Sequence, residues 1–281
     1  MNFAPSTIWT GDNLYVMRGM NSETVDLLVT DPPFNSKADY AAPIGSKAAG
    51  AAFKDTWTLT DLDVEWINLL EEAAPALQRV ILAAMTPSDK SYLVYMAVRL
   101  REMQRILKPT GSIYLHCDHT MSHYLKLLMD AIFGRKQFQN EFVWYYSGGG
   151  ASKRRWARKH DVLLFYSRSK SWTFNADEVR SPYKWVDGQT RADGSDRDLA
   201  VGKLPDDVWE HHAVMPWAKE RTGYPTQKPL ALLDRIIMAS SNRGDLVFDP
   251  FCGCATTLVA AHARGREWVG IDISPKAADL A

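Results

Sequence analysis

Short apolar segments that end at Gly, Pro, Asp or Ser alternate with helical patterns along most of this 281-residue chain. This alternation constrains the fold most, because strands separated by helices assemble into a sheet that is covered on both faces. Continuous apolar runs of this length are typical of buried parallel strands. The sequence therefore predicts an α/β fold, with strands at 26–31, 111–118, 140–146, 160–167, 245–250 and 267–274, and a weaker candidate at 6–12.

The helical patterns lie between these strands. The expected helices are 61–82, 88–107, 122–134, 228–244 and 256–265. Two of them close on a glycine, Gly134 and Gly265, as helices commonly do. Two regions break the alternation. The Ala/Gly-rich segment 35–56 is expected to be a mobile loop, and the long irregular segment 168–222 is expected to be a functional insertion.

Composition points to an ordinary soluble globular protein, with 46% hydrophobic and 23% charged residues. No apolar run reaches the roughly 18 residues of a membrane span, and the N-terminus lacks a secretory pattern, so the expected location is the cytoplasm. Three cysteines, Cys117, Cys252 and Cys254, are too few for a disulfide framework. They are expected to be reduced thiols.

A local positive cluster is hidden by the formal net charge of zero. The segment 152–160 contains no acidic residue and carries Lys153, Arg154, Arg155, Arg158 and Lys159. Such a run can neutralise the phosphates of a nucleic acid, and the alternative is a solvated surface. The prediction is a DNA-binding segment.

A strand, a turn of small residues and a helix are predicted over 245–261. Gly253 lets a ligand approach the backbone, and free amides at the helix start can meet a negative group. One strand later, Asp272 stands where a carboxylate can accept hydrogen bonds from ribose hydroxyls. The turn matches neither the dinucleotide fingerprint nor a P-loop. The layout suits a cofactor that contains a nucleoside.

Four motifs carry a family resemblance: TDPPF at 30–34, PTQKP at 225–229, DPFCGCATT at 249–257 and GIDIS at 270–274. In this order they resemble the amino-group DNA methyltransferases of the beta class, whose catalytic motif precedes the cofactor motif. The resemblance implies a three-layer α/β/α, Rossmann-like methyltransferase fold with a mostly parallel sheet and a circularly permuted motif order. It also implies S-adenosylmethionine as the cofactor, double-stranded DNA as the partner and association with the nucleoid.

The resemblance further implies which residues hold the cofactor: Asp12, Thr226, Lys228, Asp249, Phe251, Cys252, Gly253 and Asp272. It places Asp12 near the adenine, Asp272 at the ribose, and Thr226 and Lys228 at the methionine carboxylate. The chain departs from the family's F-x-G-x-G turn at Ala255. If this position requires a positive φ, alanine costs about 1 kcal/mol or more there.

The catalytic residues that the resemblance implies are Asp31, Pro32, Pro33 and Phe34. An exocyclic amine is a poor nucleophile, and two acceptors on its N–H groups stabilise the charge that develops during methyl transfer. The Asp31 carboxylate and the Pro32 carbonyl are the expected acceptors, the prolines fix the backbone, and Phe34 offers a face for stacking. The target base would be flipped out of the duplex.

Several alternatives stay open. Asp31 favours adenine N6, and the other interpretations are cytosine N4, RNA, or a catalytically silent DNA-binding subunit. The cluster His116, Cys117, His119 and His123 has ligand-like residue types, but a strand that runs into a helix explains it, so no metal is expected. The insertion 168–222 would read the DNA sequence through Arg180, Lys184, Trp185, Arg191 and Arg197. A homodimer, a restriction endonuclease partner and a further C-terminal module also stay open.

Overall fold

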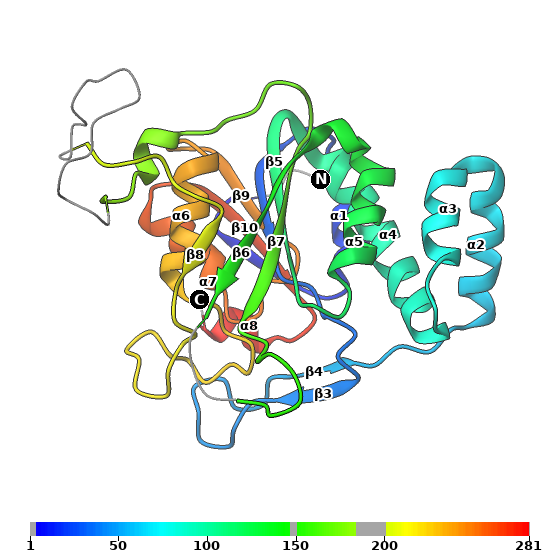
Figure 1. The fold of residues 1–281 in the computed structure, drawn as a ribbon, viewed down its shortest axis with the longest axis horizontal. Coiled ribbons are helices and arrows are strands. Elements are labelled where there is room, and N and C mark those ends of the chain that lie inside the picture. The colour runs from blue at the N-terminus through cyan, green and yellow to red at the C-terminus, as the bar shows by residue number, and fades with distance from the viewer. Residues whose placement is uncertain (1–3, 147–150, 184–200, 281) are drawn as a thin grey trace.

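An eight-stranded sheet forms the centre of the computed structural model, which describes residues 4–146, 151–183 and 201–280 (Figure 1). The strand order is β1-β10-β9-β2-β5-β7-β6-β8. The strands are β1 (Thr7–Thr10), β2 (Val25–Thr30), β5 (Leu107–Cys117), β6 (Phe138–Tyr145), β7 (His160–Ser167), β8 (Val208–Glu210), β9 (Leu246–Asp249) and β10 (Glu267–Asp272). Each strand expected from the sequence is present, and β8 is an addition.

Helices cover both faces of this sheet (Figure 1). One face packs against α1 (Asn13–Gly19), α4 (Pro87–Ile106) and α5 (Ser122–Met129), and the other against α6 (Leu230–Ser240) and α7 (Thr256–Ala263). Successive residues of β2 serve the two cores in turn: Leu28 belongs to the first, whereas Leu27 and Val29 belong to the second. Alternation of this kind is what a strand buried on both faces requires. The predicted three-layer α/β/α fold is confirmed.

Two of the predicted helices are interrupted. The pattern at 61–82 is two helices, α2 (Asp61–Ala73) and α3 (Pro75–Leu82), because Pro75 lacks an N–H and disfavours helical geometry at Ala74. The pair lies beside α4, away from the sheet (Figure 1). The pattern at 122–134 is α5 followed by a π-helical turn, Asp130–Gly134. The last helix, α8 (Lys276–Leu280), follows β10.

The direction of one strand, β7, differs from the prediction. β7 pairs antiparallel with both β5 and β6, and β8 pairs parallel with β6. The expectation of a parallel strand was therefore wrong for 160–167, whereas β6 and β8 run in the same direction as β5. Burial on both faces gives antiparallel strands the same continuous apolar composition. As a result, both ends of the link 146–159 lie at the edge of the sheet where β2 and β5 end.

The segment 35–56 is not simply a loop. It contains a two-stranded antiparallel sheet, β3 (Ala38–Ala41) and β4 (Ala52–Asp55), which lies outside the main sheet (Figure 1). The expectation of a mobile loop was wrong for these strands. Alternating half-buried and exposed residues fit a hairpin with one solvated face, but the Ala/Gly-rich composition obscures that pattern.

The described part of 168–222 packs onto the domain. It holds a 3₁₀ turn, Ala176–Val179, and β8, and the side chains of Val179 and Trp209 are buried. The Asn175 amide donates to the carbonyls of Met238 and Ser241 at the end of α6. Lys184, Trp185, Arg191 and Arg197 lie outside the described residues, so a role in reading DNA stays a prediction. No helix in the described ranges has the length and apolar character to cross a bilayer.

Candidate active site

A cavity of about 720 Å³ opens at the carboxyl ends of the parallel strands. Asp31 follows β2, Gly253 follows β9 and Asp272 ends β10, and all three line this cavity. β2 and β9 are hydrogen-bonded neighbours. The prediction that distant motifs converge on one crevice is confirmed. The other predicted catalytic and cofactor residues also line it: Asp12, Pro32, Pro33, Phe34, Thr226, Lys228, Asp249, Phe251 and Cys252.

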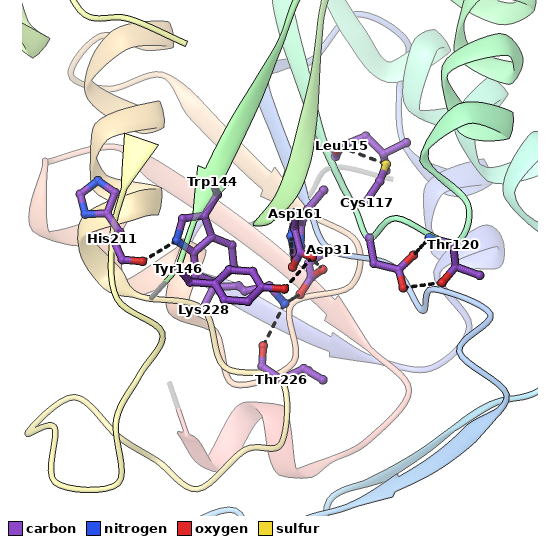
Figure 2. Close-up of polar contacts among 12 residues, drawn as sticks. Asp31, Leu115, Cys117, Thr120, Trp144, Tyr146, Asp161, His211, Thr226 and Lys228 are labelled. Atoms are coloured by element: carbon purple, nitrogen blue, oxygen red, sulfur yellow. Dashed lines mark hydrogen bonds and ion pairs between the residues drawn. The ribbon is translucent and has the colours of Figure 1, made fainter. Parts of the chain in front are cut away.

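The carboxylate of Asp31 is engaged at both oxygens. Nδ1 of His116 lies 2.6 Å from Oδ1, and Nζ of Lys228 lies 2.5 Å from Oδ2 (Figure 2). Burial opposes ionisation of Asp31, but the charges of Lys228 and His116 and their hydrogen bonds outweigh it, so the pKa falls to about 2. Asp31 is therefore a permanent hydrogen-bond acceptor at neutral pH.

Lys228 is held by this pair. Its Nζ donates to Asp31 and also to the carbonyl of Thr226, 3.1 Å away (Figure 2). It also lies 5.4 Å from the ring centre of Phe34. The predicted contact with a cofactor carboxylate stays a prediction. The structure adds that the ammonium group already donates to Oδ2 of Asp31. A second donor to that oxygen would share it with Lys228 or displace Lys228.

The loop after the two prolines is fastened by Asp55, the last residue of β4. Its carboxylate accepts the backbone N–H groups of Phe34 at 3.2 Å, Asn35 at 2.7 Å and Ser36 at 2.8 Å. Asn35 has a positive φ of 60°, which Asn tolerates better than most residues. Asp55 thus fixes the position of the Phe34 ring. No motif in the sequence indicated this role for Asp55.

The turn after β9 has the expected backbone. Gly253 and Ala255 have φ angles of 52° and 62°, so the strained alanine predicted from the motif is confirmed. A Cβ at Gly253 would lie 3.2 Å from the ring of Tyr224, a tighter contact than side chains normally make. The Gly253 N–H donates to Oδ2 of Asp272 at 2.9 Å, and the Ser274 N–H donates to Oδ1 at 2.8 Å.

Two carboxyl groups of this turn region have raised pKa values. Burial is the main cause for both. It raises the pKa of Asp249 to about 7, although hydrogen bonds from Thr257 and from the Phe251 N–H oppose the change. The nearby charges of Asp31 and Asp272 add to it. Burial also raises the pKa of Asp272, against the opposing hydrogen bonds from the backbone N–H groups of Ser274 and Gly253.

Asp12 has structural partners at the rim of the cavity. Its side chain accepts the N–H of Leu14 at the start of α1, and it pairs with Nη2 of Arg99 at 2.8 and 3.0 Å. These contacts explain why an acid stands here whether or not a ligand is bound. The predicted contact with the adenine of the cofactor is compatible with them and stays a prediction.

The basic segment lies between β6 and β7. Lys153, Arg154, Arg155 and Arg158 are exposed, Lys159 is half-buried, and the chain from 151 to 159 has no regular structure. Because β6 and β7 are antiparallel, this segment begins and ends at the edge of the sheet that carries Asp31. The positive cluster is thus attached beside the mouth of the cavity.

A family model described as DNA methylase, N6_N4_Mtase, matches residues 25–281. The chain belongs to this DNA methylase family. The membership predicted from the four motifs is confirmed. The match extends from β2 to the end of the chain and so includes both Asp31 and the turn after β9.

Two relatives and one solved structure illustrate the similarity. The chain is 31% identical to the DNA adenine methyltransferase YhdJ of Escherichia coli (strain K12), over 95% of this chain and 78% of YhdJ. It is 29% identical to the Type II methyltransferase M.HpaI of Haemophilus parainfluenzae, over 94% of this chain and 69% of that protein. The cytosine-N4-specific PvuII DNA methyltransferase matches with a TM-score of 0.60 and 15% identity, over 99% of this chain and 87% of that one. The last likeness shows the fold alone.

Proposed function

We propose that this member of the DNA methylase family transfers a methyl group to the N6 amino group of adenine at a specific DNA sequence. The observation that carries the proposal is the single cavity shared by the Asp31 carboxylate and the turn at Gly253. Asp31 in the first position of DPPF supports adenine, as does the 31% identity to an adenine methyltransferase. The enzyme class is that of the site-specific DNA methyltransferases.

Asp31 and Pro32 are the acceptors in this proposal. The amine of a flipped-out adenine donates one N–H to Oδ2 of Asp31 and the other to the Pro32 carbonyl. These two contacts would turn the nitrogen lone pair out of the plane of the base, and bound S-adenosylmethionine would supply the methyl group, with its sulfur keeping the electrons of the broken S–C bond. The carboxylate of Asp31, whose ionised form Lys228 and His116 stabilise in the ligand-free protein, places a negative charge beside the nitrogen as it becomes positive. The methylated nitrogen would then release one proton to water.

S-adenosylmethionine is the methyl donor of this family, as predicted. The cavity has residues that fit it: Asp272 for ribose hydroxyls, Phe251 for an apolar face, and the close-packed Gly253 turn for approach to the backbone. Lys228 is the cation proposed for its carboxylate. If Lys228 turns toward that group, Oδ2 of Asp31 becomes available to the amine, so that one movement would prepare both sites.

Base analysis tests the proposed function. The chain is expressed in a bacterial host that lacks DNA methyltransferases, and the host DNA is hydrolysed and analysed by mass spectrometry. N6-methyladenine is the expected product, and sequencing of the modified positions gives the target. Detection of N4-methylcytosine instead would show that cytosine is the substrate and would contradict the proposed adenine specificity. Calorimetry with S-adenosylmethionine tests the silent-subunit alternative, which predicts no heat of binding.

Removal of positive charge from the basic segment should weaken the salt dependence of DNA binding. The triple variant Lys153→Gln, Arg154→Gln, Arg155→Gln is expected to lower the slope of log affinity against log salt by up to about 2.7, since each phosphate contact contributes about 0.9. A matched triple variant of exposed residues at the opposite edge of the sheet, Arg135→Gln, Lys136→Gln, Lys170→Gln, should leave the slope unchanged. Equal slopes for both triples would place the DNA path elsewhere.

A further inference from the structure

His116 lies at the end of β5 between two carboxylates that come from other strands. Its Nδ1 is 2.6 Å from Oδ1 of Asp31, and its Nε2 is 3.2 Å from Oδ2 of Asp161. The side chain is 4% exposed. Asp161 is the second residue of β7 and reaches the histidine because β7 runs antiparallel to β5. The hydroxyl of Tyr146 donates to the other oxygen of Asp161, and Figure 2 shows Tyr146 and Asp161 beside Asp31.

We propose that His116 is a positioning residue for methyl transfer: held as an imidazolium by Asp161, it fixes the orientation and the negative charge of Asp31. The proposal rests on the proposed function, which gives Asp31 its role as the acceptor for the amine. It gives a function to His116, whose position at a strand end does not by itself indicate one.

The charged groups around His116 favour its protonated form. Asp31 faces it from the end of β2, Asp161 from β7 and Lys228 from the segment before α6, while Tyr146 acts through Asp161. Burial opposes the imidazolium, and so does Lys228, but the two carboxylates outweigh them and raise the pKa of His116. Both ring nitrogens then carry a proton, and each donates to a carboxylate.

In the proposed reaction, Asp31 needs the hydrogen bond and the charge of His116 when Lys228 moves. Within the described residues, His116 and Lys228 are the two cations bound to Asp31. In the proposed arrangement the amine donates to Oδ2, the oxygen that Lys228 contacts, whereas the contact of His116 at Oδ1 is unaffected by the amine. Without His116, burial would raise the pKa of Asp31 and weaken it as an acceptor. The same imidazole also packs edge-on against Phe34, 5.2 Å between ring centres.

Three substitutions separate the parts of this proposal. His116→Asn keeps a donor near the position of Nδ1 but removes the charge and the link to Asp161. His116→Leu removes all of these. Asp161→Asn keeps an acceptor for Nε2–H but removes the negative charge. Tyr114→Phe is the matched control, because it lies on the same strand and loses a buried hydrogen bond to Ser240 without contacting Asp31.

The measurements use the full chain. The protonation of His116 is followed by NMR of its imidazole in the ligand-free protein as a function of pH. The single-turnover rate is measured with radiolabelled S-adenosylmethionine and enzymatically amplified, unmethylated DNA of mixed sequence, and cofactor affinity is measured by calorimetry. Asp161→Asn should lower the titration midpoint of His116. It should also move the high-pH limb of the rate profile to lower pH, because the imidazolium is the active form.

The rate should fall at least 100-fold for His116→Leu and about tenfold for His116→Asn, with cofactor affinity within threefold of the parent. Tyr114→Phe should change none of these quantities. A His116→Leu protein within threefold of the parent rate would overturn the proposal, and so would an unchanged midpoint in Asp161→Asn. If His116→Leu does not fold, the other two variants decide. A parent protein that binds the cofactor but methylates no DNA would overturn the proposed function, whereas the NMR midpoint would still decide whether Asp161 holds the imidazolium.

Discussion

Replacement of Asp31 by Asn should lower the methylation rate by at least about 10³-fold while leaving cofactor affinity intact or higher. The loss follows because a neutral amide gives little stabilisation to a nitrogen that becomes positive, and groups of this kind contribute several kcal/mol to the barrier. Affinity for S-adenosylmethionine should not fall, since Lys228 loses its anionic partner and is released toward the cofactor. Single-turnover rates and calorimetry on the same preparation measure the two effects.

The control is Asp234→Asn, which removes a surface ion pair with Arg264 and lies outside the cavity. It should retain both the rate and the affinity. An Asp31→Asn protein that turns over at a near-parental rate would contradict the role of Asp31 as acceptor. A large loss of cofactor affinity in that variant would instead contradict the proposed movement of Lys228.

Replacement of Asp249 by Asn should stabilise the ligand-free protein, and more so at high pH. The pKa of Asp249 is about 7 in the folded protein and close to the ordinary value of 3.8 when unfolded, so the folded state binds the extra proton between these values. Stability therefore falls as pH rises from about 4 to about 7, because ionisation in the buried site is unfavourable. The neutral amide of the Asp249→Asn variant would avoid this loss, which is about 4 kcal/mol at pH 8 and less than half of that at pH 5.

Urea denaturation at pH 5 and pH 8 measures the difference between Asp249→Asn and the parent. The amide keeps an oxygen that can accept the Phe251 N–H, so the substitution changes charge more than shape. The surface variant Asp234→Asn should change the free energy of unfolding by under about 1 kcal/mol at both pH values. The same stability gap at pH 5 and pH 8 would show that Asp249 does not titrate between them.

The cofactor side of the site could be predicted because it depends on local order along the chain. Asp249 and Asp272 end apolar runs, and residues at the carboxyl ends of parallel strands meet at one edge of a sheet. The departure at Ala255 was visible for the same reason, since the motif fixes which residue needs a positive φ. These features follow from the motif, the strand end and the turn alone.

The support for Asp31 could not be predicted from the same patterns. The contact between His116 and Asp161 depends on strand direction, and a continuous apolar run indicates burial without indicating direction. The link 146–159 did carry a signal, because its sequence has no helical pattern of the kind that usually connects parallel strands. The role of Asp55 is harder still to predict from the sequence. Its partners are backbone N–H groups, which leave no trace in residue identity.

The order of the strands separates two blocks within the sheet. β1, β10 and β9 lie on one side of β2, and β7, β6 and β8 lie beyond β5 on the other. Chimeras between relatives could therefore exchange the block from β6 to β8, which includes the basic segment. The strands β1, β10, β9, β2 and β5, which carry the proposed cofactor site and Asp31, would remain intact. Such a graft must preserve Asp161, because this residue lies in the exchanged block yet contacts His116 in the half that the recipient keeps.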